Sequence, residues 1–478
     1  MLISELLQEV KTTGAYTDCA VLDVTDNTKN ISAGAVFVCI QGARFDGHLT
    51  ALEMEKQGAV LIVAERDTGA KNQVLVENSR SAYAQICAAF YGYPSRKLQL
   101  IGVTGTNGKT TTTMLLHGLL RRAGISAGLI GTVENRIGEK VYPASLTTPD
   151  CKDLHRLFAE MVAAGCTHCI MEVSSQALAQ RRVDGCHFAL ALFTNLTQDH
   201  LDYHGTFQNY MQAKRMLFSM ADTAILNTDD AYAPEMVKDT DVKVITFSAN
   251  RDDSDYTAKN IICTASGVQY ELLGRGDIGR VQVKIPGHFT VYNSMAAAVC
   301  AIESGISFEQ VLTLLAGAEG VKGRVEVVPT DTDYTVLIDY AHSPDGVQNV
   351  ISSLREVAEK RIITVFGCGG DRDRNKRPKM GKIVGDLSDV AVVTSDNPRT
   401  EKPEKIIEEI LAGMTACKAR IQTIPDRTSA IRWALTHAKK GDVVLLAGKG
   451  HETYQILNTG KIHYDEREIV ADILKGKK

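Results

Sequence analysis

Residues 103–112 read VTGTNGKTTT and stand between an apolar stretch, LQLIGV, and a segment with helical periodicity. In this setting a Gly-Lys-Thr turn suits phosphate binding, because backbone N–H groups and a helix N-terminus attract anions. Lys109 then supplies a positive charge, and Thr110 supplies a ligand for Mg²⁺. The general pattern G-x-x-x-x-G-K-[ST] requires Gly where the chain has Val103, so an ordinary glycine-rich turn is the alternative. We predict phosphate binding, since strand, turn and helix come in the required order.

The composition is that of a globular protein with several domains. Of its 478 residues 44% are hydrophobic and 23% charged, and 53 basic against 57 acidic residues leave a net charge of -4. Because both signs are interspersed, no field favours nucleic acid as a partner. MLISELLQEVK (1–11) has helical spacing and carries acidic residues in place of the basic flank of a signal peptide. No apolar run reaches the about 18 residues of a membrane span, so we expect a cytoplasmic protein.

The eleven cysteines form no disulfide framework along the chain. Only Cys166-x-x-Cys169 has the spacing of a redox or zinc pair. This pair lies where a helix end precedes a buried strand, whereas a redox pair opens a helix after a strand. Buried thiols are therefore the preferred interpretation.

The pattern of elements predicts an α/β protein of three domains. Residues 1–97 hold short apolar runs and one helical pattern, and Pro and Ser in YPSRK (93–97) end this small α/β section. Residues 98–325 alternate strand-like and helix-like segments, which predicts a P-loop ATPase domain built on a mainly parallel sheet. Within them, the polar stretch 247–287 is typical of antiparallel strands. Residues 326–478 alternate again, which predicts a Rossmann-like domain.

Polar residues follow the strand-like THCIMEV segment at the point where the strand is expected to end. Glu172 closes an otherwise apolar run, and a buried acid needs a partner such as a cation. Hydroxyl and basic groups come next, at Ser174, Ser175, Arg181 and Arg182. A serine that caps a helix, with solvated arginines beyond it, is the alternative interpretation.

A second polar cluster, NLTQDHLDYHG, follows another strand-like segment and contains Asp199, His200, Asp202 and His204. Zinc is possible by composition, but the spacing matches no usual zinc pattern and no cysteine is near. His200 is instead a candidate for holding Mg²⁺ beside the nucleotide. A turn capped by the aspartates is the remaining alternative.

Charged side chains also follow the strand-like segments of the last section. Asp339 ends one of them, and Arg324 stands where the section begins. We expect these two residues to complete an ATP site when domains close. Two polar loops, FGCGGDRDRNKRP and TSDNPRTEKPE, contain Arg372, Arg374 and Arg399, which can bind carboxylates through two parallel hydrogen bonds. Exposed surface charge is the alternative for each.

Taken in order, these segments resemble the Mur ligase family, which joins amino acids to peptidoglycan precursors using ATP. The resemblance spans the chain through GTNGKTT (105–111), EVSSQAL (172–178), DHLDYH (199–204), YN (292–293), GR-x-E (323–326), DYAHSPD (339–345), GCGGDRD (367–373), DNPR (396–399) and AGKGHE (447–452). Its phosphate loop has the form G-T-x-G-K-T, which explains why Val103 departs from the wider pattern.

The resemblance implies an ATP site, a Mg²⁺ site and a set of catalytic residues. The implied ATP-binding residues are Gly105, Thr106, Asn107, Gly108, Lys109, Thr110, Thr111, Asn293, Arg324, Asp339 and His342. The implied Mg²⁺ residues are Thr110, Glu172, His200 and Lys214, the last as a carbamylated lysine. The implied catalytic residues are Lys109, Glu172, His200, Lys214 and Arg324.

The likeness is closest to the members that add the third residue of the stem peptide, and it implies two further binding sites. The residues implied for UDP-N-acetylmuramoyl dipeptide are Thr25, Asn27, Thr147, Thr148, Ser174, Gln180 and Arg182. Those implied for meso-diaminopimelate are Arg372, Asp396, Asn397, Pro398, Arg399, Gly448 and Glu452. The chain departs from the family at its usual D-S-R segment, which is Asp26-Asn27-Thr28 here.

The implied chemistry is acyl activation by a monomeric enzyme. The γ-carboxylate of D-Glu attacks the γ-phosphate of ATP, and the amine of diaminopimelate then attacks the acyl phosphate. The alternatives are the same ligase using L-lysine, another amide ligase such as a folylpolyglutamate or cyanophycin synthetase, and a regulatory NTPase that forms no amide.

Overall fold

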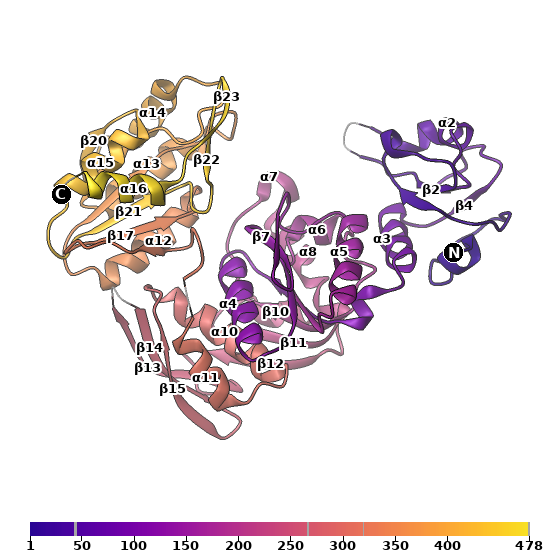
Figure 1. Ribbon diagram of the computed structural model, residues 1–478, viewed down its shortest axis with the longest axis horizontal. Coiled ribbons are helices and arrows are strands. Elements are labelled where there is room, and N and C mark those ends of the chain that lie inside the picture. The colour runs from indigo at the N-terminus through magenta and orange to yellow at the C-terminus, as the bar shows by residue number, and fades with distance from the viewer. Residues whose placement is uncertain (43–44, 265–266, 319, 477–478) are drawn as a thin grey trace. The chain divides into compact units, whose positions relative to one another are not determined.

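The computed structural model describes residues 1–42, 45–264, 267–318 and 320–476, which form two compact units (Figure 1). The first unit comprises Met1–Asp255 and Ala296–Ile306, and the second comprises Tyr256–Met295 and Ser307–Lys478. Helix α10 (Phe289–Glu303) therefore contributes residues to both units. In the described ranges, no helix is long and apolar enough to cross a membrane.

The N-terminal part of the first unit is a parallel sheet in the order β1-β2-β3-β4. Its elements are α1 (Ile3–Leu6), β1 (Asp23–Thr25), β2 (Ala35–Val38), α2 (Ala51–Lys56), β3 (Leu61–Ala64), β4 (Gln73–Leu75) and α3 (Ser79–Phe90). Alternate residues of β2 serve two cores, because Val36 and Val38 pack with α3 while Phe37 packs with α2. The helix expected over 1–11 is shorter than predicted, since α1 has four residues.

The rest of the first unit is a larger sheet in the order β12-β11-β10-β5-β9-β6-β7-β8. The parallel strands are β5 (Gln99–Thr104), β6 (Ala127–Ile130), β9 (His168–Glu172), β10 (Phe188–Phe193), β11 (Ala221–Asn227) and β12 (Lys243–Ser248). The antiparallel strands β7 (Glu134–Ile137) and β8 (Lys140–Pro143) extend one edge. The helices are α4 (Lys109–Arg122), α5 (Cys151–Ala163), α6 (Ser175–Ala179), α7 (Leu201–His204), α8 (Phe207–Arg215) and α9 (Ala233–Met236).

This larger sheet places its polar loops as parallel strands require. Strand β5 pairs with β9 on one side and β10 on the other, so the loops after all three strands lie at one edge of the sheet. Cys166 and Cys169 are buried free thiols beside and within β9, and burial raises the pKa of Cys169. The preference for buried thiols over a redox pair is consistent with this placement.

The second unit begins with an antiparallel sheet of β13 (Tyr256–Thr264), β14 (Gly267–Gly274) and β15 (Asp277–Val283), as the polar stretch 247–287 predicts. Helix α11 (Phe308–Ala316) packs against β15.

The remainder of the second unit is a sheet in the order β16-β17-β21-β18-β19-β20, in which β16 alone is antiparallel. Its strands are β16 (Glu326–Val328), β17 (Thr335–Asp339), β18 (Ile362–Phe366), β19 (Val390–Val393), β20 (Arg420–Thr423) and β21 (Val443–Ala447). Its helices are α12 (Pro344–Val357), α13 (Lys376–Leu387), α14 (Pro403–Leu411), α15 (Arg427–His437) and α16 (Glu466–Lys475). A hairpin of β22 (Tyr454–Leu457) and β23 (Gly460–His463) precedes α16.

The strands of this sheet bury both faces. Leu337 and Leu445 pack with α12, α13 and α14, whereas Ile338 and Leu446 pack with α15 and α16. Such double burial explains why these strands read as continuous apolar runs and why their polar loops stand out in the sequence.

Candidate active site

The phosphate loop begins two residues later than the general pattern requires. Val103 is fully buried and pairs with Glu172 in the sheet, because β5 continues to Thr104. Gly105 has φ 150°, and a Cβ there would lie 1.9 Å from Thr194 Oγ1. Gly108 has φ 86° and caps α4. The loop thus runs from Gly105 to α4, and its glycines stand where a side chain would be strained or blocked.

The loop is held against the end of β10. Asn107 N donates to Asn195 Oδ1 at 2.9 Å, and Thr194 Oγ1 donates to Asn107 O at 2.7 Å. Lys109 Nζ donates to Gly105 O at 2.8 Å and to Thr106 O at 2.9 Å. In the structure the lysine ammonium group donates to these two backbone carbonyls. In a nucleotide complex, phosphoryl oxygens would replace the carbonyls as acceptors.

Glu172 is buried at the end of β9 and accepts hydrogen bonds from two neighbouring loops. Thr110 Oγ1 donates to Glu172 Oε2 at 2.9 Å. Thr132 donates to Oε1 from its backbone N at 2.8 Å and to Oε2 from Oγ1 at 3.0 Å. A carboxylate beside a threonine hydroxyl at a helix N-terminus is a donor set that fits Mg²⁺.

Lys214 lies in α8 with its ammonium group buried beneath the phosphate loop. Its Nζ donates to Gly105 O at 2.7 Å and lies 4.6 Å from the centre of the Tyr210 ring. Burial lowers the pKa of Lys214 well below its usual value, and the nearby charge of Lys109 lowers it further. Burial and the Lys109 charge thus both disfavour the protonated form of Lys214.

His200 lies at the surface beside the same loop, with a left-handed φ of 52°. Its ring contacts the Tyr210 ring at 6.1 Å between centres, and Tyr210 Oη bonds Thr106 Oγ1 at 3.0 Å. His204 points elsewhere and bonds Ser175 Oγ at 2.9 Å. The Asp202 side chain lies outside the described part of the structure, and no metal-binding cluster of three His, Cys, Asp or Glu residues occurs among the described ones.

Residues predicted to bind the dipeptide form a network around Thr148. Thr148 Oγ1 donates to Glu172 O at 2.8 Å and accepts from Ser174 N at 3.0 Å. Arg182 Nη1 donates to Thr148 O at 2.8 Å, and Nη2 donates to Gln180 Oε1 at 2.7 Å. Thr147 is linked to it as well, because its hydroxyl lies 3.0 Å from Thr132 Oγ1. Ser174 also caps α6 through Ala177 N, as the alternative interpretation of this serine predicts.

The N-terminal segment around Asn27 lies near the start of α5. Asn27 N donates to Thr25 Oγ1 at 3.1 Å, and Asn27 Oδ1 accepts from Lys29 N at 3.0 Å. Burial raises the pKa of Asp26, and the charge of Asp150 raises it further. Because Asp150 also pairs with Arg182 at 3.1 Å, the segment stands close to the dipeptide network.

In the second unit, Arg324 and Asp339 come together as expected. Asp339 is buried and accepts from Val325 N and Ala341 N, each at 2.7 Å. Burial raises the pKa of Asp339, and the Arg324 charge opposes that rise. The Arg324 guanidinium lies 5.1 Å from the centre of the Tyr340 ring, and the His342 ring lies 4.6 Å from the same ring. Asn293 is buried in the part of α10 that belongs to this unit.

The loops after β19 and β21 meet around a buried lysine that the sequence did not single out. Lys449 Nζ lies 3.1 Å from Glu452 Oε2 and 3.6 Å from Asp396 Oδ1, and it donates to Asn397 Oδ1 at 3.2 Å. Gly448 has φ 117°, and a Cβ there would lie 2.9 Å from Asp396 Oδ2. A lysine between two glycines after a buried strand was the available signal.

Arg399 comes from the same group of loops and crosses to the loop after β18. Its Nη1 donates to Gly370 O at 2.8 Å and to Asn397 O at 3.4 Å, and the guanidinium makes no other hydrogen bond to described residues. Pro398 is buried, and a Cβ on Gly370 would lie 1.9 Å from its carbonyl oxygen. Arg372 stands exposed on the facing loop. The loops therefore carry two guanidinium groups, the buried carboxylate of Asp396 and the partly buried carboxylate of Glu452.

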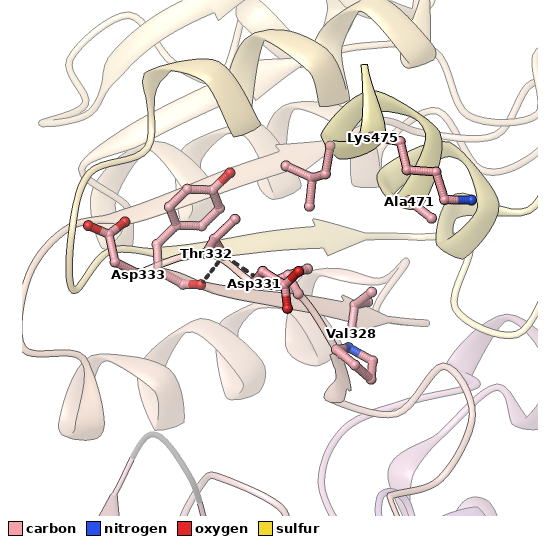
Figure 2. A pocket seen from close by; sticks show the side chains of 10 residues that line it. Val328, Asp331, Thr332, Asp333, Ala471 and Lys475 are labelled. Atoms are coloured by element: carbon pink, nitrogen blue, oxygen red, sulfur yellow. Dashed lines mark hydrogen bonds between the residues drawn. The ribbon is translucent and has the colours of Figure 1, made fainter. Parts of the chain in front are cut away.

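A separate cavity of about 710 Å³ opens at the other edge of this sheet, before β17 (Figure 2). Its hydroxyls bond one another and the backbone, with Thr330 and Thr332 2.7 Å apart and Thr332 Oγ1 donating to Tyr334 O at 2.7 Å. Because ligands of parallel sheets bind at the carboxyl ends of the strands, this cavity is not the candidate site.

A phosphate loop, a buried carboxylate and a threonine hydroxyl at the end of a parallel sheet define a P-loop nucleotide-binding α/β protein. Three family descriptions match the chain: Mur ligase family, catalytic domain (24–91), Mur ligase middle domain (103–301) and Mur ligase, glutamate ligase domain (323–450). The chain belongs to the Mur ligase family. This confirms the resemblance, the ligase class and the three-domain α/β fold class with its P-loop and Rossmann-like sheets.

Three of the similar proteins share one name. The UDP-N-acetylmuramoyl-L-alanyl-D-glutamate--2,6-diaminopimelate ligase of Geobacillus kaustophilus is 43% identical over 97% of this chain and 96% of its own length. The ligase of that name from Caldanaerobacter subterraneus is 45% identical over 92% of each chain. A solved structure with that name aligns with a TM-score of 0.73 at 30% identity, covering 96% of this chain and 95% of the other.

Proposed function

We propose that the chain is an ATP-dependent ligase that adds meso-diaminopimelate to UDP-N-acetylmuramoyl-L-alanyl-D-glutamate in peptidoglycan precursor synthesis. The observation that carries the proposal is the shared name of relatives that are 43% and 45% identical over nearly the whole chain. The chemistry of the loops supports it. The loops around Lys109 and Glu172 suit a nucleotide, and those around Lys449 suit a charged amino acid.

Two steps form the amide. The γ-carboxylate of D-Glu attacks the γ-phosphorus of ATP, which releases ADP and leaves an acyl phosphate. The amine of diaminopimelate then attacks the acyl carbon, phosphate leaves, and the amine loses a proton. No protein nucleophile takes part, so Lys109 and Arg324 act by stabilising negative charge on phosphoryl oxygens.

The remaining groups of the first unit position the substrates. The dipeptide binds at the network of Thr148, Ser174 and Arg182, next to the phosphate loop. Thr110 and Glu172 would hold Mg²⁺, with His200 and a carbamate on Lys214 as the further candidates. Bound there, Mg²⁺ neutralises charge on the phosphoryl groups.

Diaminopimelate binds at the loops around Lys449. Asp396 and Glu452 are carboxylates that suit its ammonium groups, and Arg372 and Arg399 suit its carboxylates. The Arg399 guanidinium uses only Nη1 for its hydrogen bonds to described residues, which leaves its other nitrogens to bind a carboxylate. L-lysine lacks the distal carboxylate and would leave one guanidinium facing an ammonium group.

The test compares the two amino acids. Wild-type protein is supplied with ATP, UDP-muramyl dipeptide and either meso-diaminopimelate or L-lysine, and product and ADP are measured. We expect kcat/KM to favour diaminopimelate strongly. The Arg399→Ala variant should lose about 1.5–3 kcal/mol of this preference, or about ten- to a hundred-fold, because a charge-assisted pair is removed.

Other outcomes identify the alternatives. Equal use of both amino acids by the wild type would show that Arg399 does not select the substrate. ATP hydrolysis without product would favour the regulatory NTPase. Arg355→Ala is the control, because Arg355 pairs with Asp389 at 2.7 Å on the far end of α12.

The domain boundaries after residues 97 and 325, the monomeric state and the cytoplasmic location stay predictions.

A further inference from the structure

The loops that carry Arg372 and Arg399 are joined directly to each other. Gly370 N donates to Asn397 O at 2.9 Å, and Thr400 Oγ1 donates to Asp371 Oδ1 at 2.7 Å. Asp371 N donates to Glu401 Oε1 at 2.6 Å. The distance between the two substrate-facing arginines therefore depends on how these loops are held at their base.

Arg377, in the first turn of α13, lies at that base with its side chain fully buried. Its Nη1 donates to Glu401 Oε2 at 2.9 Å and its Nη2 to Glu401 Oε1 at 2.7 Å. Nη2 also reaches Gly369 O at 3.2 Å, and Nη1 reaches Glu409 Oε2 at 2.8 Å on α14. One guanidinium thus binds the loop after β18, the loop after β19 and the helix that follows.

The fork between Arg377 and Glu401 is charged under ordinary conditions. Hydrogen bonds from the Arg377 side chain, and next from the Asp371 backbone, lower the pKa of Glu401 to about 2. A planar guanidinium that meets a carboxylate through two parallel bonds fixes distance and angle together, which an ammonium group cannot do.

We propose that Arg377 is a positioning residue that sets the separation of Arg372 and Arg399 and so determines selection of the amino acid. This inference rests on the proposed function. Diaminopimelate carries a carboxylate at each end, so its recognition requires two guanidinium groups at a set spacing. A small change in that spacing weakens an ionic contact without affecting the phosphate loop.

Two variants remove the fork without adding bulk. Arg377→Lys keeps the positive charge but loses the two parallel bonds. Glu401→Gln keeps the shape of the side chain but removes its negative charge. Because Glu401 is partly exposed, this variant should fold even if Arg377→Lys does not. Arg361→Lys is the matched control, because Arg361 makes a similar fork to Asp442 at the opposite edge of the sheet.

The measurements are KM for each of the three substrates, kcat, and the ratio of kcat/KM for diaminopimelate and L-lysine. We expect both variants to raise KM for diaminopimelate about tenfold and to lower its preference over lysine by a similar factor, as for loss of a charge-assisted bond. KM for ATP and for the dipeptide should change less than about twofold, as should every constant of Arg361→Lys.

Two results would overturn the inference. One is an unchanged KM and preference in the variants that fold, and the other is an equal rise in KM for all three substrates, which indicates a general loss of structure. Turnover of the wild-type protein with diaminopimelate tests the proposed function independently of the variants. If the wild type uses lysine instead, the same KM comparison is made with lysine, since the fork between Arg377 and Glu401 sets the loop spacing for either substrate.

Discussion

Two lysines meet at one carbonyl oxygen, because Lys109 and Lys214 both donate to Gly105 O. Positive charges on these two side chains repel each other, and of the two only Lys214 is fully buried. Burial, and next the repulsion from Lys109, therefore lower the pKa of Lys214. At the scale of single residues, the two lysines at this carbonyl thus differ in burial, and the more buried one has the lowered pKa.

Lys109→Ala should abolish ligation while UDP-muramyl dipeptide binding changes little. The reason is that the lysine charge acts on phosphoryl oxygens as charge develops in the transition state, whereas the dipeptide network around Thr148 does not include it. Turnover and dipeptide affinity are measured on the same preparation. A variant that keeps a tenth of the wild-type turnover would contradict the role of this loop.

Lys214→Ala should be nearly inactive, and a short carboxylic acid at high concentration should restore part of the rate. Only a neutral amine adds CO2, and the lowered pKa of Lys214 favours that form. The resulting carbamate is an anion that could stand beside Mg²⁺, which the ammonium form would repel. Activity with and without added acid checks this, and wild-type activity in the variant would rule out a catalytic carbamate.

At the scale of elements, backbone geometry explains how one strand end becomes a phosphate loop. Strand β5 ends at Thr104, and the chain then needs a residue with φ 150° whose Cβ position is filled by Thr194 Oγ1. Only glycine meets both conditions. The sequence predicted the loop from its order of elements, but the close approach to β10 is a contact between distant segments that spacing alone does not reveal.

Gly105→Ala should lower stability by about 1–3 kcal/mol and weaken ATP binding, because the new methyl group overlaps Thr194 and displaces the loop. Gly124→Ala is the matched control. Gly124 also has a positive φ, of 81°, but no atom lies within 4 Å of its Cβ position. It should cost only about 1–2 kcal/mol of backbone strain and leave ATP affinity unchanged. Thermal melts and ATP titrations measure both variants, and equal ATP affinities would contradict the steric argument.

At the scale of the whole molecule, α5 packs against α3 of the N-terminal sheet and against the core of the larger sheet. His155 is fully buried in this helix, and neither ring nitrogen has a hydrogen-bond partner in the described structure. Burial lowers the pKa of His155 from 6.5 to about 3. The unfolded chain therefore binds a proton at His155 between these values, while the folded chain does not.

Stability should accordingly fall as pH decreases from 6.5 towards 3, by up to about 1.4 kcal/mol per pH unit from this residue. His155→Leu removes the titrating group and should reduce that slope. Urea unfolding at pH 7 and pH 5 provides the comparison. His187→Leu, at an exposed position, should keep the wild-type slope, and an unchanged slope in His155→Leu would refute the assignment.

The sequence by itself determined the class of fold, the phosphate loop and the residues of each family motif. It could do so because buried parallel strands are continuous apolar runs, and the polar loops that follow them stand out. Motif order also predicted Glu172, Thr148, Arg182 and Arg399, and the structure brings each into contact with other predicted site residues.

Only the tertiary structure decided which of these side chains bond one another and which unnamed residues hold them. The sequence analysis singled out neither Lys449 nor Arg377, although both lie in loops that it did consider. Both are buried, and each binds groups from more than one loop. Their burial depends on loops that follow different strands and meet at one edge of the sheet. Local periodicity carries no information on such contacts, because the residues involved are separated by tens of positions along the chain.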